Sequence, residues 1–395
     1  MTTCKAWMKY SWEGAYCEHP PLEGDSEGLC ILHSQKPEKD KTAFDQTLHE
    51  KMTREDYDFR KVFFPGPISF IGHKFKKPVN FQGARFPGWA NFREAEFAEL
   101  ADFSSARFVQ SVVFEKARFS GQALFKNTEI MGEADFRGAT FDSRAVFQQV
   151  NEMPGTSEAS AFSAYFQYIN FGPWGLLRFQ DLSLARVSFL GADLRRCEFH
   201  NVHWHSHRGR QVVFDEMLLR EKGESALAGF ASASEPRLDY EGLCVAVEEL
   251  YRYLKLNFEK EGDQKQAGDF HYGEMEMHRR ANPWRRWFPF SWYNLYWALS
   301  GYGERPLRAL GWLLGLIGAM GLTLAYEGLK THPGMGAGFG PAVVYLLQQA
   351  TLIRPEWAEP LTLGGQLIGA LSRLLIPAQL ALFILALHSR LGRRR

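Results

Sequence analysis

Phenylalanine recurs along the first half of the chain at spacings that alternate between five and six residues. The series comprises Phe70, Phe75, Phe81, Phe86, Phe92, Phe97, Phe103, Phe108, Phe114, Phe119, Phe125, Ile130, Phe136, Phe141 and Phe147. A small or β-branched residue precedes most of them by two positions, as at Ala84, Ala90 and Val112. Neither the 3.6-residue period of a helix nor the 2.0-residue period of a strand fits this spacing. The pattern therefore predicts a chain that turns a corner in every unit, with four corners closing one coil of about 22 residues in a parallel β-solenoid.

The same pattern returns after a polar interruption at residues 148–160. From Phe179 to Trp204 the large inward residues stand strictly five apart. Stretches such as ADFSSARF (101–108), ADFRGATF (134–141) and GADLRRCEF (191–199) resemble the pentapeptide-repeat family. The resemblance covers residues 66–204 and implies a right-handed quadrilateral β-solenoid, which we place at 61–205 as one part of a multidomain protein.

The balance of positive and negative side chains argues against some classes of function for the solenoid. The chain holds 46 Lys and Arg against 45 Asp and Glu, for a net charge of +1. A surface of mixed sign favours neither nucleic-acid binding nor an acidic mimic of DNA. We expect a rigid spacer or docking wall. The sequence shows no glycine-rich phosphate loop, no set of nucleophile, base and orienting group, and no open metal site, so we expect no enzymatic activity.

Three of the five cysteines and two histidines lie close together near the N-terminus. A two-residue gap separates Cys30 from His33, which allows both side chains to bind one tetrahedral ion. We predict that residues 1–60 form a cap with a structural Zn²⁺ held by Cys4, Cys17, Cys30 and His33, with His19 as a reserve ligand for His33. The alternative is a set of free thiols and surface histidines. The first 25 residues contain no apolar segment typical of a signal peptide, so we expect this cap in the cytosol with reduced thiols.

A linker and a helical neck follow the solenoid, at residues 206–283. Residues 205–240 are polar, whereas residues 240–280 carry an amphipathic helical pattern that Gly262 interrupts. We therefore expect two helices in this cytoplasmic neck, ended by Pro283.

The last part of the chain, residues 284–395, has the composition of a membrane domain. Residues 284–302 are rich in Trp, Tyr and Phe, as in an interfacial helix. Residues 307–326 and 366–388 are apolar and long enough to cross a bilayer of about 30 Å. Two buried helices in a soluble core are the alternative. Arg residues gather before the first span and after the second, so we predict an inner-membrane protein with both termini cytoplasmic.

Residues 340–353, between the two spans, form an apolar segment that is too short to cross the bilayer. A polar hairpin follows this segment. This order resembles the two-transmembrane ion-channel-like domain that follows pentapeptide repeats in some bacterial membrane proteins. The resemblance implies a homo-oligomer, with a tetramer favoured, around a path for ions. The segment lacks the Gly-Tyr-Gly of a potassium filter, so potassium selectivity is not predicted.

Six polar residues of this region are our candidates for the pore lining. They are Gln348, Gln349, Thr351, Glu356, Glu359 and Arg373. An Arg within a membrane span marks a functional site by default, with snorkelling to the outer interface as the alternative. For the two glutamines the alternative is hydrogen bonding between helices.

These features predict a channel-like, oligomeric inner-membrane protein that contacts the bilayer and carries a cytoplasmic regulatory or assembly domain. Two other functions stay open. One is a non-conducting, membrane-anchored scaffold that recruits a cytosolic protein partner, and the other is a triggered effector that permeabilises the membrane.

Overall fold

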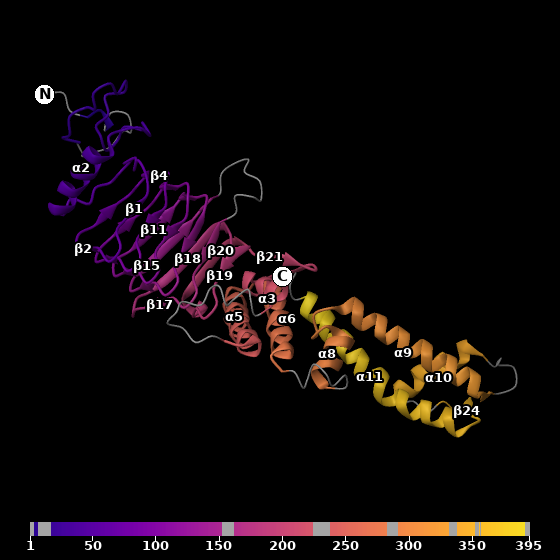
Figure 1. The fold of residues 1–395 in the computed structure, drawn as a ribbon. Coiled ribbons are helices and arrows are strands. Elements are labelled where there is room, and N and C mark those ends of the chain that lie inside the picture. The colour runs from indigo at the N-terminus through magenta and orange to yellow at the C-terminus, as the bar shows by residue number, and fades with distance from the viewer. Residues whose placement is uncertain are drawn as a thin grey trace. The chain divides into compact units, whose positions relative to one another are not determined.

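The computed structural model describes residues 4–6, 17–151, 162–223, 238–282, 291–331, 338–351, 355 and 357–391 (Figure 1). The chain forms two compact units, Met1–Asn257 and Phe258–Arg395.

Parallel β-sheets on the four sides of a coil make up most of the first unit, as the Phe spacing predicted (Figure 1). One sheet contains β3 (Val79–Asn80), β7 (Ala101–Asp102), β11 (Ala123–Lys126), β15 (Arg144–Gln148), β18 (Leu176–Ser183) and β20 (Cys197–His203). A second contains β1 (Ile68–Ser69), β5 (Ala90–Asn91), β9 (Val112–Val113), β13 (Glu133–Asp135), β16 (Ser163–Tyr165) and β19 (Arg186–Ser188). A third contains β2 (Lys74–Phe75), β6 (Glu96–Phe97), β10 (Arg118–Phe119), β14 (Thr140–Phe141) and β17 (Asn170–Phe171). The fourth contains β4 (Arg85–Phe86), β8 (Arg107–Phe108) and β12 (Glu129–Ile130).

The register of these sheets confirms the predicted length of a coil. Arg118 pairs with Glu96 on one side and with Thr140 on the other, so paired residues are 22 positions apart. The step lengthens to 30 residues where Phe141 pairs with Phe171, because the chain between them includes the polar interruption. In the last coil it shortens to 20, where Phe179 pairs with Phe199.

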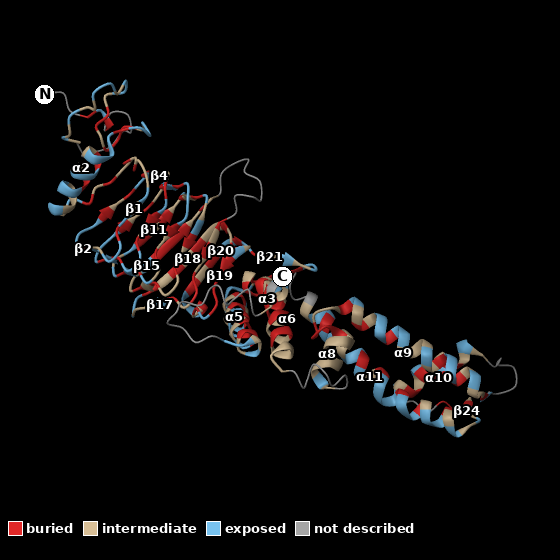
Figure 2. Cartoon of the chain, in the orientation of Figure 1, coloured by how far each residue is buried: buried red, intermediate tan, exposed pale blue. Residues whose placement is uncertain are grey.

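The inward phenylalanines stack in columns inside the coil, where buried residues line the interior (Figure 2). Phe103 lies between Phe81 and Phe125, with ring centroids 5.1 and 5.0 Å away and the planes within 11° of parallel. The column continues to Phe147 and Phe179 at successive separations of 4.6 and 5.3 Å. This confirms that each predicted Phe position is a core position.

Two kinds of corner explain why the spacing alternates between five and six. In each five-residue unit, the second residue after the Phe has a positive φ of 51° to 64°. These residues recur every eleven positions, at Lys61, Gly72, Gly83, Glu94, Ser105, Lys116, Asn127, Gly138 and Gln149. At Gly83 this left-handed conformation costs little, because glycine has no Cβ. The corner of each six-residue unit contains one residue more than the corner of a five-residue unit.

An Asn or Asp directly before the Phe stabilises the tighter corner. The Asp102 side chain accepts a hydrogen bond from the Ser104 N–H at 2.8 Å, and Asn91 accepts one from the Arg93 N–H at 2.9 Å. Such side chains satisfy turn amides that face away from the neighbouring coil.

The stacked core begins at Phe59, which is eleven residues, or half a coil, before the Phe70 that opens the predicted series. Phe59 stacks on Phe81 at 4.9 Å, and Phe64 stacks on Phe86 at 4.5 Å. Helix α2 (Lys41–Thr53) covers this first coil, and its Phe44 ring meets Phe64 edge-on at 5.7 Å.

The last coil includes a short turn, η2 (Leu194–Arg196). The segment that the sequence analysis treated as a linker forms the antiparallel pair β21 (His205–His207) and β22 (Arg210–Val212) and the helix α3 (Phe214–Lys222). Helix α5 (Tyr240–Glu261) corresponds to the first of the two predicted neck helices and ends directly before Gly262. Asp215 is buried and accepts a hydrogen bond from the Phe189 N–H at 3.0 Å. Asn257 donates to the Leu194 carbonyl at 2.8 Å.

The second unit is helical. It contains α6 (Gln264–Arg280), α8 (Trp292–Ser300), α9 (Pro306–Glu327), α10 (Phe339–Ala350) and α11 (Leu363–Leu391), with β23 (Leu329–Thr331) paired antiparallel to β24 (Ala358–Pro360). Helices α9, α10 and α11 correspond to the predicted first span, short segment and second span. Their shared core is a cluster of Leu313, Leu324, Leu329, Ala342, Tyr345, Leu346, Ala358 and Ile376.

Removing one ring from a column should destabilise the solenoid. We expect Phe103→Ala to lower the free energy of unfolding by about 3 to 5 kcal/mol, because the cavity lies between two stacked rings that cannot close it. Unfolding of the full chain by guanidinium, followed by circular dichroism, measures the change. Val109→Ala, at an exposed position, should change it by less than about 0.5 kcal/mol. Equal effects of the two substitutions would contradict the columnar core.

Candidate metal centre and membrane segment

Cys4, Cys17, Cys30 and His33 converge at one point of the N-terminal cap. Their four ligand atoms all lie within 4.8 Å of one another. The Cys17 and Cys30 sulfurs are 3.7 Å apart, and the Cys4 sulfur is 3.6 Å from His33 Nδ1. A tetrahedral zinc site with bonds of about 2.3 Å to sulfur separates its sulfurs by about 3.8 Å. The cluster can therefore hold a metal ion, and its residues are the four that the sequence analysis selected.

Short backbone turns bring these residues together. Between Cys30 and His33 the chain turns so that the His33 and Ser34 amides donate to the Cys30 carbonyl, at 3.1 and 2.8 Å. Asp25 supports this turn by accepting a hydrogen bond from the Ser34 hydroxyl at 2.5 Å. The Cys4 amide donates to the His19 carbonyl at 3.0 Å, which places Cys4 beside the turn.

The other ring nitrogen of His33 determines which nitrogen can bind a metal. Nε2 lies 3.1 Å from the Arg60 carbonyl oxygen. A carbonyl only accepts, so Nε2 carries the proton and Nδ1 is the nitrogen that faces the thiols. The same bond ties the cluster to the first coil of the solenoid.

Lys39 makes a second connection to that coil. Its buried ammonium donates to the Leu32, Ser34 and Phe63 carbonyls, at 3.3, 3.2 and 2.5 Å. Burial lowers the pKa of Lys39 to about 7. The three carbonyls belong to the cap turn and to the first coil, so one side chain holds the two together.

The side chains of the cluster change one another's ionisation. Hydrogen bonds with Cys17 and Cys30 lower the pKa of Cys4 well below its usual range, whereas contacts with Cys30 and Cys4 raise the pKa of Cys17. Burial lowers the pKa of His33, but hydrogen bonds with Cys30 and Cys4 outweigh this effect and raise it to about 9. A thiolate thus forms most easily on one sulfur alone. A divalent cation would allow all three to ionise.

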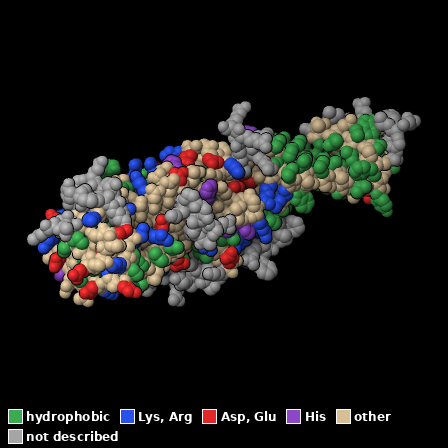
Figure 3. Space-filling model, turned by 90° about the horizontal axis from the view of Figure 1, so that it is seen from above, with side chains coloured by type: hydrophobic (Ala, Val, Ile, Leu, Met, Phe, Trp, Pro, Cys, Tyr) green, Lys and Arg blue, Asp and Glu red, His purple; other side chains and the backbone are tan. Residues whose placement is uncertain are grey.

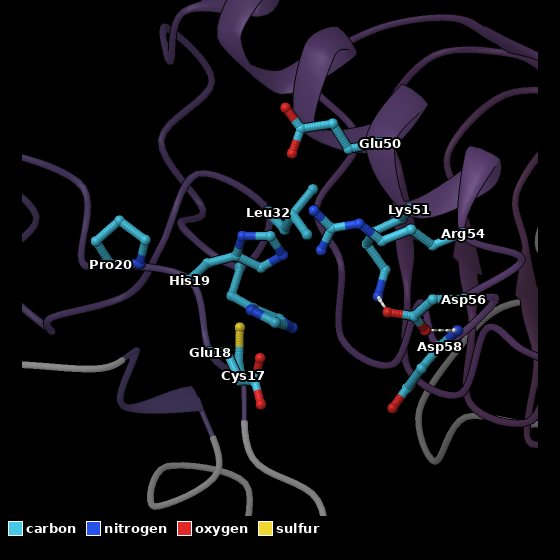
Figure 4. Close-up of a pocket in the computed structure, with 11 residues that line it drawn as sticks. Cys17, Glu18, His19, Pro20, Leu32, Glu50, Lys51, Arg54, Asp56 and Asp58 are labelled. Atoms are coloured by element: carbon cyan, nitrogen blue, oxygen red, sulfur yellow. Dashed lines mark hydrogen bonds and ion pairs between the residues drawn. The ribbon is translucent and has the colours of Figure 1, made fainter.

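A cavity of about 520 Å³ opens beside the cluster, with Cys17 and His33 in its wall (Figure 4). Charged side chains of both signs surround it: Glu18, Glu50, Lys51, Arg54, Asp56 and Asp58. His19 also lines the cavity, and burial followed by the charge of Lys51 lowers its pKa. His19 stands outside the group of four converging ligands, so the cluster is complete without the reserve ligand.

Comparison with known proteins identifies the repeat. Residues 59–107 and 103–151 match the family model described as pentapeptide repeats (9 copies). The coiled segment is a pentapeptide-repeat solenoid. No curated protein and no solved structure matches the chain. The match includes Phe59 and Phe64, which the predicted Phe series left out although the five- and six-residue spacing already begins there.

Helices α9 and α11 are long and apolar enough to cross a membrane. Only 28% of the α9 span and 22% of the α11 span are buried within the chain. Apolar side chains gather over these helices on the surface of the second unit (Figure 3). A soluble protein would bury such helices, so their exposure argues against the alternative of a water-soluble core.

The structure brings together part of the predicted pore lining. Gln349 is buried, and its Oε1 accepts a hydrogen bond from Arg373 Nε at 2.5 Å. Gln348 Oε1 accepts one from Trp357 Nε1 at 2.7 Å. Thr351 ends α10, with its hydroxyl 2.8 Å from the Gln348 carbonyl.

The two remaining candidates are Glu359 and Glu356. Glu359 is exposed on β24 and pairs across to Lys330 on β23. Glu356 lies outside the described residues. Gln379, which was not among the predicted residues, is buried on α11 and donates to the Ala309 carbonyl at 2.9 Å. Its amide in an otherwise apolar span was the available signal.

Loss of one ligand should remove the metal from the cap. We expect the purified full chain to contain one metal ion per chain. The His33→Gln variant should contain far less, because a site with only three protein ligands binds the metal more weakly. Elemental analysis by mass spectrometry measures the content. His19→Gln is the matched control and should keep the ion. Equal metal content in the two variants, or none in the wild type, would contradict the assignment.

Proposed function

We propose that the protein is an oligomeric, channel-like inner-membrane protein whose pentapeptide-repeat solenoid is a cytoplasmic regulatory or assembly domain. The observation that carries this proposal is the second unit itself. Two spanning helices expose most of their apolar surface, and the half-length helix α10 packs between them with polar residues at its end. Non-helical backbone is tolerated at membrane depth only where protein or water surrounds it.

Several copies are needed to enclose a path for ions. Two spans and one short helix cannot surround a lumen alone. Gly311, Gly315 and Gly318 on α9 have open space where a side chain would stand, whereas Gly321 faces Val343 of α10. Exposed small residues allow the helix of another copy to approach closely. A tetramer is favoured by the resemblance to two-transmembrane channel domains.

The distribution of cations supports the proposed orientation. Arg279, Arg280, Arg305 and Arg308 precede or begin α9, and the chain ends in LGRRR after α11. The segment between the two spans has only Lys330 and Arg354. Positive residues favour the cytoplasmic side, so both termini and the solenoid would lie there.

In this proposal the Cys₃His cluster holds a structural Zn²⁺. All four positions would be filled by protein, which leaves no site for a substrate. The ion would stiffen a segment that has few apolar contacts of its own and would fix it to the first coil through His33. The solenoid surface, with charges of both signs, would serve as a wall for other copies or for a cytosolic protein partner, and no enzymatic step is proposed.

Electrical recording tests the channel directly. We expect the full chain in planar bilayers to give discrete current steps, and Gly321→Leu to reduce them, because a side chain there would collide with Val343 at about 3 Å. Leu385→Ala, at an exposed position of α11, should leave the currents unchanged. Silence at voltages of both signs would exclude conduction and favour the non-conducting scaffold. Currents only after a trigger, together with toxicity on expression, would favour the effector.

The oligomeric state is a separate test. We expect the detergent-solubilised chain to have the mass of several copies, and Gly315→Leu to shift it toward smaller species, because the added side chain would hold neighbouring helices apart. Gly340→Leu, at another glycine with open space, is the control. Native mass spectrometry gives the copy number. A monomeric wild type would rule out a central pore.

A further inference from the structure

Arg373 is placed deep within the apolar band of α11. It follows Leu363 by ten residues, which corresponds to about 15 Å along a helix. Leu363, Leu367 and Leu371 lie between it and the start of the helix, and their side chains are 74%, 57% and 49% exposed. Apolar surface therefore continues well beyond Arg373 toward the outer end. An Arg side chain is too short to cross that distance to the lipid headgroups.

Within the described helices α9, α10 and α11, no other charge lies at this depth. Helix α9 has none between Arg308 and Glu327, α10 has none, and α11 has only Arg373 before its last turn. Glu327, at the outer end of α9, accepts a hydrogen bond from the Thr362 hydroxyl at 2.6 Å. Each copy thus brings one positive charge to the middle of the membrane.

A specific contact holds the guanidinium in place. Its Nε donates to Gln349 Oε1 at 2.5 Å, and the Gln349 side chain is only 3% exposed. One turn earlier on both helices, Gly369 faces the Tyr345 hydroxyl, so α10 and α11 run together up to this pair. Gln349 lies at the C-terminal end of α10, where the helix dipole favours a cation.

The rest of the guanidinium is left without a counter-charge. The Arg373 side chain is exposed, and among the described residues no carboxylate forms an ion pair with it. Facing lipid, such a group would cost several kcal/mol. Facing a water-filled lumen, it would stay hydrated.

We propose that Arg373 lines the conduction path and selects small inorganic anions such as chloride. This inference rests on the proposed channel function. In an assembly of several copies the Arg373 side chains form a ring of positive charge at the midplane. A ring of Arg or Lys attracts anions and repels cations, which is how pores obtain anion selectivity. Gln349 is the positioning residue that keeps the guanidinium turned to the lumen.

Reversal potentials test this proposal. The full chain is recorded in planar bilayers under a potassium chloride gradient, and the reversal potential is expected near the equilibrium potential of chloride. Arg373→Lys keeps the charge and should keep that value. Arg373→Gln should move it toward zero, and Arg373→Glu should move it toward the equilibrium potential of potassium. Lys330→Gln, which removes a cation outside the apolar band, should have no effect.

A cysteine variant covers the case in which these substitutions prevent assembly. The second unit has no native cysteine, so Arg373→Cys is open to thiol reagents of either charge. A cationic methanethiosulfonate should restore the preference for chloride, and an anionic one should reverse it.

The outcomes separate the two proposals. No current from the wild type would overturn both. A wild-type current that is cation-selective or unselective would overturn the role of Arg373 and leave the channel standing. An unchanged reversal potential in Arg373→Gln would also overturn the role of Arg373 and leave the channel standing. It would mean that the side chain contacts lipid or another copy and does not face the lumen.

Discussion

The stacking of phenylalanine rings at the spacing of hydrogen-bonded strands determines the first unit. Neighbouring strands in a sheet are about 4.8 Å apart. The stacked rings of successive coils lie 4.5 to 5.7 Å apart. Because the two distances nearly coincide, one residue type can fill a column without tilting the coils. Ile130, the one residue other than Phe in the series from Phe70 to Phe147, lies in β12, which is the last described strand of its sheet.

A column of repeated units has two ends, and each end would expose rings and unpaired strands to water. Buried polar groups bind the covering segments to the coil at both ends of the solenoid. At the start, His33 and Lys39 bond to carbonyls of the first coil, while α2 covers its rings. At the other end, Asp215 accepts from a coil amide and Glu216 binds the Arg210 and Arg220 guanidiniums. Burial raises the pKa of Glu216, but these arginines outweigh it and lower the pKa overall.

Periodic features were predictable from the sequence, and contacts between distant segments were not. The Phe spacing identifies the core because burial follows the period of the coil, and the spans were predictable because length and composition decide them. The metal ligands could be selected because they lie within one short segment. In contrast, Glu216 depends on Tyr251, which is 35 residues later and donates to its carboxylate. The pairing of Gln349 with Arg373 likewise joins two helices, α10 and α11, from positions 24 residues apart in the sequence, and no local pattern specifies it.

The two units treat a buried or membrane-embedded charge differently, and the difference separates structure from function. Glu216 has hydrogen bonds from Arg210, Arg220 and Tyr251, so its burial is fully compensated and needs no further partner. Arg373 has one described hydrogen bond, to the neutral amide of Gln349, and in the proposed membrane arrangement it lies at a depth where only the protein can provide water. For the stability of the helix pair alone, leucine would be more favourable than arginine at position 373, because an uncompensated charge destabilises the pair. In the proposed channel, the arginine has a role that leucine could not take, because its charge acts on the ions that pass beside it.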